Sequence, residues 1–242
     1  LADAPAIDTL VVPVGGGGML AGCAVAARGL RPDIAVIGVE TAGYSAMRQL
    51  LAGEAVTVGG DTIAEGIAVR DIGQAPLAIA RALVDRVLTV DEVAIERAIA
   101  LFLEVEKTVA EGAGAAGLAA LLAHPEVFAG RTVGLILCGG NIDTRLLASV
   151  LLRGLVRDGR IVRLRLMIPD LPGQLARVAG LIGGAGGNIV EVQHQRLFGS
   201  VVAKATELDV TVESRDRDHA RELVAALQAE GFKVRVLEGA DA

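Results

Sequence analysis

The 242-residue sequence lacks tryptophan and has only one tyrosine and four phenylalanines, so aromatic residues make up 2% of the chain. Proteins that bind nucleic acids need basic surfaces and aromatic stacking platforms. A net charge of −6 together with so few aromatic rings argues against such binding. The chain also has only two cysteines, Cys23 and Cys138, which form no disulfide framework and favour a reducing, cytoplasmic setting.

Long apolar helices are also missing. The longest uncharged stretch, residues 9–27, contains Pro13 and four consecutive glycines, so no membrane-spanning helix is expected there. Hydrophobic residues nevertheless make up 52% of the sequence, which excludes a disordered chain. A chain of this length is expected to fold into one or two domains.

Charge is distributed unevenly along the chain. Residues 1–158 carry 12 basic and 18 acidic side chains, whereas residues 159–242 carry 11 of each. The change falls in the polar, glycine-containing stretch 153–160, where we place a domain boundary. The predicted domains are therefore residues 1–158 and 159–242.

The first predicted domain alternates short apolar strands with helices. Asp91 and Glu92 lie in the first turn of a long helical pattern, where they favour the positive end of its dipole. Apolar strands separated by helices predict an α/β layer fold with a mainly parallel sheet. Strands are expected at residues 10–12, 34–39, 87–90 and 133–137, and helices at 19–28, 45–51, 91–107 and 115–123.

The second predicted domain has a different pattern. Arg163 and Arg165 alternate with apolar residues, so its first strand is expected to have one solvent-facing side. The order of its elements, βαββαβ, predicts a ferredoxin-like arrangement. Strands are expected at residues 161–168, 188–195, 203–212 and 232–237, and helices at 173–182 and 216–229.

Four glycines, residues 15–18, lie between the first predicted strand and the first predicted helix. Without side chains the backbone can approach an anion closely, and the free N–H groups at the start of the helix point toward it. A phosphate group is therefore expected here. The pattern Gly16-x-Gly18-x-x-Ala21 also fits the dinucleotide fingerprint loosely, with Glu40 as the ribose-binding acid, which leaves a nicotinamide cofactor open.

Four ordered motifs, at residues 11–18, 63–69, 108–115 and 134–143, together resemble the threonine ammonia-lyases, over residues 1 to about 155. This resemblance implies the tryptophan-synthase-β fold (fold type II) and the cofactor pyridoxal phosphate. It implies that Cys138 lies beside the pyridine nitrogen, with Glu111 and Asn141 near the cofactor ring. It also implies that the cofactor phosphate is bound by backbone N–H groups of Gly15, Gly16, Gly17, Gly18 and Met19.

The lysine that such enzymes use to form a Schiff base with the cofactor is not found in its family context. The chain has three lysines, Lys107, Lys204 and Lys233, and none lies near either glycine turn in sequence. We therefore expect a chain that lacks the N-terminal portion of the enzyme, consistent with its start at Leu1, and that is inactive by itself. Related serine racemases bind a metal through a glutamate corresponding to Glu40, but the second carboxylate position is Ala46 here, so no metal is expected.

The resemblance implies deamination of L-threonine, or L-serine, with L-threonine giving 2-oxobutanoate and ammonia. Two alternatives stay open at this point. One is a fragment of a nicotinamide-dependent oxidoreductase, based on the Gly16, Gly18 and Glu40 pattern. The other is a non-catalytic protein that senses amino acids.

The second predicted domain resembles an ACT domain, an amino-acid-sensing module, through its βαββαβ order and its Asp-x-Pro-Gly turn. Such domains usually pair side by side, so a homo-oligomer is expected. The resemblance implies an effector site that contains Asp170, Pro172, Gly173 and Asn188. The expected effector is a branched-chain amino acid, isoleucine or valine.

Overall fold

The computed structural model describes residues 1–195 and 205–237. It divides into two compact units, Leu1–Leu151 and Leu152–Ala242, which are treated separately below. The division falls inside helix α7 (Thr144–Arg157), seven residues before the domain boundary predicted between residues 158 and 159, and the polar stretch around that boundary is helical as far as Arg157. The helix forms because Leu146, Leu147 and Val150 pack against the core of the first unit. No helix among the described residues is long and apolar enough to span a membrane.

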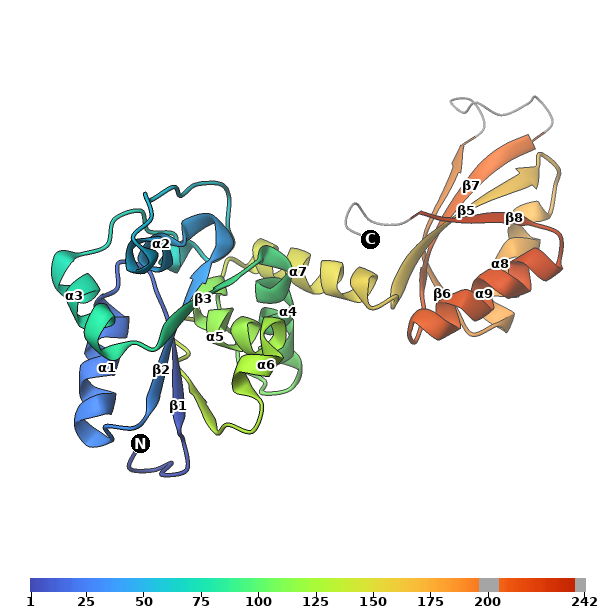
Figure 1. Ribbon diagram of the computed structural model, residues 1–242. Coiled ribbons are helices and arrows are strands. Elements are labelled where there is room, and N and C mark those ends of the chain that lie inside the picture. Colours follow the sequence, from blue (N-terminus) through green and yellow to red (C-terminus); the bar gives the residue numbers. More distant parts are fainter. Residues whose placement is uncertain (196–204, 238–242) are drawn as a thin grey trace. The chain divides into compact units, whose positions relative to one another are not determined.

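The first unit contains a four-stranded sheet in the order β3-β2-β1-β4, and each neighbouring pair is parallel. This confirms the predicted parallel α/β fold. The strand order reverses at β1, because β2 and β3 lie on one side of it and β4 on the other (Figure 1). The strands are β1 (Thr9–Pro13), β2 (Ala35–Thr41), β3 (Arg86–Val90) and β4 (Val133–Leu135).

Two hydrophobic cores cover the two faces of this sheet. Val12 and Val36 belong to the core with α1 (Gly18–Leu30), α2 (Ala46–Ala52) and α3 (Gln74–Leu83). Val11 and Ile37, their neighbours along the strands, belong to the core with α4 (Glu92–Glu104), α5 (Gly112–Ala123), α6 (Pro125–Phe128) and α7. Successive residues of a strand point to opposite faces, which explains why both members of each neighbouring pair, Val11 with Val12 and Val36 with Ile37, are apolar.

The second unit contains a four-stranded sheet in the order β6-β7-β5-β8, with neighbouring strands antiparallel. Its elements follow the order βαββαβ along the chain, and both helices cover the same face (Figure 1). The expected strand at 203–212 lies partly outside the described residues. The elements are β5 (Ile161–Pro169), α8 (Gln174–Gly184), β6 (Asn188–Gln195), β7 (Ala205–Glu213), α9 (Arg217–Ala229) and β8 (Lys233–Leu237).

Alternate residues of β5 and β7 form the core beneath these helices, including Leu164, Leu166, Leu208 and Val210. Arg163 and Arg165 lie on the opposite face, so β5 has the polar side expected from its sequence.

Candidate cofactor site

The glycine loop, residues 15–18, and the segment 138–141 emerge at the same edge of the first sheet. The loop follows β1 and the segment follows β4, and these parallel strands are paired, with Val11 opposite Leu135. The pairing continues beyond β4, because the N–H of Ile136 donates to the carbonyl oxygen of Val11 at 3.0 Å. The carboxyl ends of parallel strands at a reversal of strand order form the usual ligand crevice of open α/β sheets.

Two glycines of the loop lie in crowded surroundings inside the protein. A methyl group added at Gly17 would lie 2.7 Å from Cε of Met47 and 2.9 Å from Cβ of Pro76. Gly17 also has a φ of 88°, which disfavours any other residue. A methyl group at Gly15 would lie 3.1 Å from the side chain of Val69.

The other two glycines face open space. A methyl group at Gly18 would meet nothing within 4 Å, and one at Gly16 would meet nothing closer than 3.9 Å. The fold therefore does not require glycine at either position. Within the described ranges, no backbone N–H group from Gly15 to Met19 has a protein acceptor. Free donors beside an open space fit the phosphate group that the sequence predicts.

Three further segments converge beside this loop. A methyl group at Gly112, at the start of α5, would lie 2.4 Å from the carbonyl oxygen of Ile63. A methyl group at Gly114 would lie at the same distance from the carbonyl oxygen of Gly139. The short 3-10 helix η2 (Glu65–Ile67) closes the arrangement, because Gly66 lies against both Gly15 and Ala113. The structure thus brings together all four motifs that carried the sequence resemblance.

Glu111, directly before α5, links the start of this helix to the segment 138–141. Its N–H donates to the carbonyl oxygen of Gly139 at 3.1 Å, and its carboxylate lies against Gly139. Cys138 is exposed at this edge. Partial loss of water around its sulfur and the nearby charge of Glu111 raise the pKa of the Cys138 thiol, which is therefore protonated at neutral pH. Asn141 is exposed beside it, and Met19 is partly exposed at the start of α1.

Glu40 has a local structural role. Its side chain is buried, and its two oxygens accept hydrogen bonds from the N–H groups of Met47 at 2.8 Å and Arg48 at 3.0 Å. Glu40 therefore caps the N-terminus of α2, and burial raises its pKa to about 7. Both carboxylate oxygens thus face the backbone of α2, so the structure gives the nicotinamide interpretation no support. Among the described residues, no group of three metal-ligating side chains occurs.

None of the three lysines belongs to the four converging motifs. Lys107 has a φ of 54°, and its ammonium donates to the carbonyl oxygen of Glu104 at 2.6 Å. This reversal of the backbone explains why α4 ends at Glu104 and not at residue 107 as predicted. Lys233 belongs to β8 of the second unit, and Lys204 lies outside the described residues.

The structure does not bring together the four residues of the expected effector site within one chain. Asp170, Pro172 and Gly173 form the turn that follows β5, and Gly173 has a φ of 85°. Asn188 begins β6 opposite Glu213, which in turn pairs with the first residue of β5. The turn and Asn188 are therefore separated by the length of a nine-residue strand, about 30 Å. The side chain of Asn188 donates to Glu213 at 2.8 Å.

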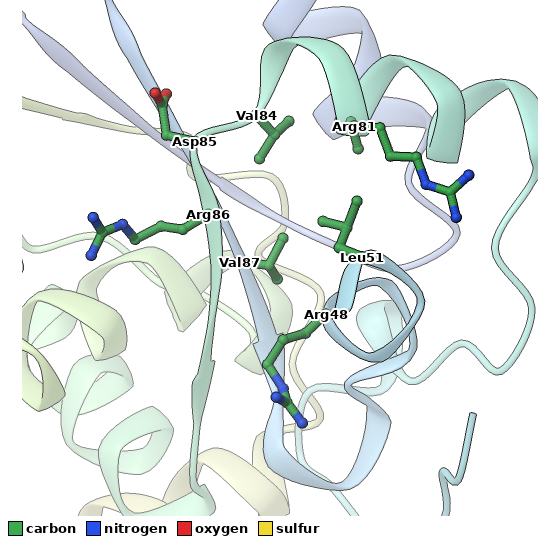
Figure 2. Close-up of a pocket in the computed structure, with 8 residues that line it drawn as sticks. Arg48, Leu51, Arg81, Val84, Asp85, Arg86 and Val87 are labelled. Atoms are coloured by element: carbon green, nitrogen blue, oxygen red, sulfur yellow. The ribbon is translucent and has the colours of Figure 1, made fainter. Parts of the chain in front are cut away.

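A hollow of about 250 Å³ lies between α2, α3 and the start of β3 (Figure 2). Arg48, Arg81 and Arg86 surround it, but their guanidinium groups point in different directions and away from one another (Figure 2). The residues Val84 and Asp85 in its wall precede β3, whereas the glycine loop follows the carboxyl end of β1. This hollow is separate from the cofactor site.

Curated relatives match nearly the whole chain. It is 37% identical over 237 residues to an L-threonine ammonia-lyase of Thermotoga maritima, covering 97% of this chain and 59% of the relative. It is 41% identical over 244 aligned positions to an L-threonine ammonia-lyase of Geobacter sulfurreducens, covering 98% of this chain and 60% of the relative. The chain thus spans about 60% of the length of these relatives.

Solved structures show the same likeness over about two thirds of this chain. The processed form of threonine deaminase isoform 2 from Solanum lycopersicum has a TM-score of 0.57 at 30% identity, covering 62% of this chain and 45% of that one. Maize serine racemase has a TM-score of 0.57 at 34% identity, covering 64% of this chain and 50% of that one. The model of the pyridoxal-phosphate-dependent enzyme family matches residues 1–139, which include most of the four converging motifs. The chain therefore belongs to the family of pyridoxal-phosphate-dependent enzymes.

Proposed function

We propose that this chain forms the greater part of a pyridoxal-phosphate-dependent ammonia-lyase that deaminates L-threonine, or L-serine. The observation that carries the proposal is the pair of glycines, Gly16 and Gly18, whose lack of side chains serves no contact within the protein. A phosphate bound by the free N–H groups would explain both glycines, because a side chain at either position would enter the space that the phosphate needs. The L-threonine ammonia-lyases that match almost the whole chain supply the substrate class.

Each part of the site has a role in the proposed reaction. When bound, pyridoxal phosphate withdraws electrons from the α-carbon of the substrate, which permits loss of the α-proton and of the β-hydroxyl group. The N–H groups of Gly15 to Met19 would hold the phosphate and so fix the position of the ring. Cys138 would be the partner of the pyridine nitrogen, where its neutral thiol would add no charge. Glu111 holds the segment of Cys138 in place through Gly139.

The Schiff-base lysine is proposed to come from the portion of the enzyme that these 242 residues do not span. The purified chain is then expected to release no 2-oxobutanoate from L-threonine. Joining it to the portion of the Thermotoga maritima relative that it does not match is expected to give measurable release. Deamination by the chain alone, or an inactive fusion that is folded and binds pyridoxal phosphate, would contradict the proposal.

Phosphate recognition can be tested separately from activity, by fluorescence titration of the 242-residue chain with pyridoxal phosphate. Replacing Gly18 with valine is expected to weaken binding at least tenfold, because its side chain enters the open space beside the free N–H groups. The matched control is Gly22→Val in the same helix, where an added Cβ atom also meets nothing within 4 Å. Both variants are expected to keep the melting temperature of the parent within a few degrees. Equal affinities of the two variants for pyridoxal phosphate would contradict the proposal that this loop binds the phosphate.

We further propose that the second unit is an ACT domain that binds isoleucine or valine between two copies of the chain. β6 is an edge strand of its sheet. Antiparallel pairing of β6 with β6 of a second copy would place Asn188 of one chain at the end of the sheet that holds the turn 170–173 of the other. The separation of these residues within one chain is therefore compatible with a shared site. Free N–H groups at the start of α8 would receive the effector carboxylate.

Calorimetric titration of the whole chain with isoleucine, valine, threonine and serine tests this regulatory proposal. Binding of isoleucine or valine at millimolar or lower concentration is expected, and Asn188→Ala is expected to weaken it at least fivefold. Because Asn188 is exposed, this variant is expected to fold normally. Absence of amino-acid binding by a folded, dimeric chain would contradict the proposed effector site and leave the second unit a role in assembly alone.

A further inference from the structure

The face of the second sheet that α8 and α9 leave uncovered has its charges sorted by strand. Among the described residues, the charged side chains that β6 and β7 place on this face are all acidic, and those that β5 and β8 place there are all basic. The acidic half consists of Glu191, Glu207, Asp209 and Glu213, and the basic half of Arg163, Arg165, Lys233 and Arg235.

The central strands neutralise each other within the chain. Asp209 accepts two hydrogen bonds from Arg165, at 2.7 and 2.8 Å, and one from Arg163 at 3.2 Å. The outer strands do not. In the described part of the chain, Lys233 and Arg235 on β8 have no ion pair, and Glu191 on β6 accepts only from the amide of Gln193. Unpaired positive charge thus lies along one edge of the face and unpaired negative charge along the other.

We propose that this face binds a second copy of the same chain through a two-fold axis that lies between the sheets, parallel to the strands. Such an axis places β8 of one copy over β6 of the other, and β5 over β7. Each unpaired basic edge then meets an unpaired acidic edge, and both contacts are identical by symmetry. An axis across the strands would instead place like charges opposite each other. This pairing is independent of the proposed activity and of edge pairing through β6.

The size of the face sets the expected strength of the dimer. Four strands spaced about 4.8 Å apart and up to about 30 Å long bury roughly 500 Å² per copy. That area lies at the lower limit for specific interfaces, so a weak, salt-sensitive association is expected.

The experiment is sedimentation velocity of the whole chain with charge-reversed variants. Arg235→Glu and Glu191→Lys each place like charges opposite each other at both symmetric contacts. Both side chains are exposed and lack ion pairs among the described residues, so normal folding is expected. Each variant alone is expected to weaken dimer formation at least tenfold at about 50 mM salt. An equimolar mixture of the two is expected to regain the affinity of the parent, because both contacts again join opposite charges.

Within one chain residues 191 and 235 lie three strands apart, about 14 Å, so recovery on mixing reports a contact between chains. Arg221→Glu, on the exposed side of α9, changes the net charge equally and is expected to leave association unchanged. Edge pairing through β6 does not depend on these charges, so the reversals report only on association through the face. Three results would overturn the proposal: a parent whose association does not weaken as salt is raised, two reversals that both leave association unchanged, or a mixture that fails to recover.

Discussion

Replacing Gly112 with alanine is expected to lower the free energy of unfolding by about 3 kcal/mol, because the added methyl group has no space. It would lie 2.4 Å from the carbonyl oxygen of Ile63 and 2.7 Å from Cα of Ala64. Both are backbone atoms, so no flexible side chain can move aside. The start of α5 must then separate from the segment 63–66, which also contacts the glycine loop through Gly66. Urea unfolding followed by circular dichroism measures the loss.

The control for this experiment is Gly22→Ala in the exposed middle of α1. A methyl group there meets nothing within 4 Å, so the better helix propensity of alanine acts alone. We expect a gain of about 0.5–1 kcal/mol. The two substitutions add the same group to a helical glycine and are expected to change stability in opposite directions. Equal stability of the two variants would refute the close approach at Gly112.

Replacing Asp209 with asparagine is expected to destabilise the protein by about 2 kcal/mol at pH 7. The side chain is only 3% exposed and holds two arginines, Arg163 and Arg165. Asparagine has one acceptor oxygen in place of two, and its amide group faces a guanidinium donor. One arginine therefore loses its hydrogen bond to a buried side chain, although Arg163 keeps the side-chain oxygen of Gln193 and Arg165 keeps the carboxylate of Glu207.

The effect of this substitution should depend on pH. Hydrogen bonding by Arg165, together with the positive charges of both arginines, holds the pKa of Asp209 below its ordinary value. A carboxyl group whose pKa is lowered in the folded state stabilises that state above its unfolded pKa, about 3.9. This contribution is lost as the pH falls through the lower, folded-state pKa. The difference between parent and variant is thus expected to be full at pH 7 and to shrink below about pH 4.

Chemical unfolding at several pH values between neutral and acidic conditions measures this difference. The control is Asp218→Asn, which removes an exposed partner of Arg221 on α9 and is expected to change stability by less than about 0.5 kcal/mol. If the Asp209 variant followed the parent at every pH, the ion pairs would contribute nothing to stability.

The sequence alone determined the features that depend on local order. Apolar runs separated by helical patterns predicted the parallel sheet, because strands buried on both faces need apolar side chains at every position. Four glycines between a strand and a helix predicted an anion site, and the motif order predicted the cofactor family. Local patterns were less informative where contacts between distant segments determine whether a helix forms and where it ends. The sequence did not predict helix α3, whose first turn contains Pro76, and the pattern over residues 91–107 did not reveal the reversal at Lys107.

Only the tertiary structure decided which residues act together. Gly15 and Gly17 are crowded by Val69, Met47 and Pro76, contacts between segments far apart in sequence, whereas Gly16 and Gly18 face open space. Glu40 could have been a metal ligand or a ribose acceptor by its position, but both of its oxygens cap α2. Asn188 and the turn after β5 are close in sequence, yet the antiparallel register places them at opposite ends of the sheet. A one-dimensional pattern specifies the face and the element of a side chain, while strand order and register specify its neighbours.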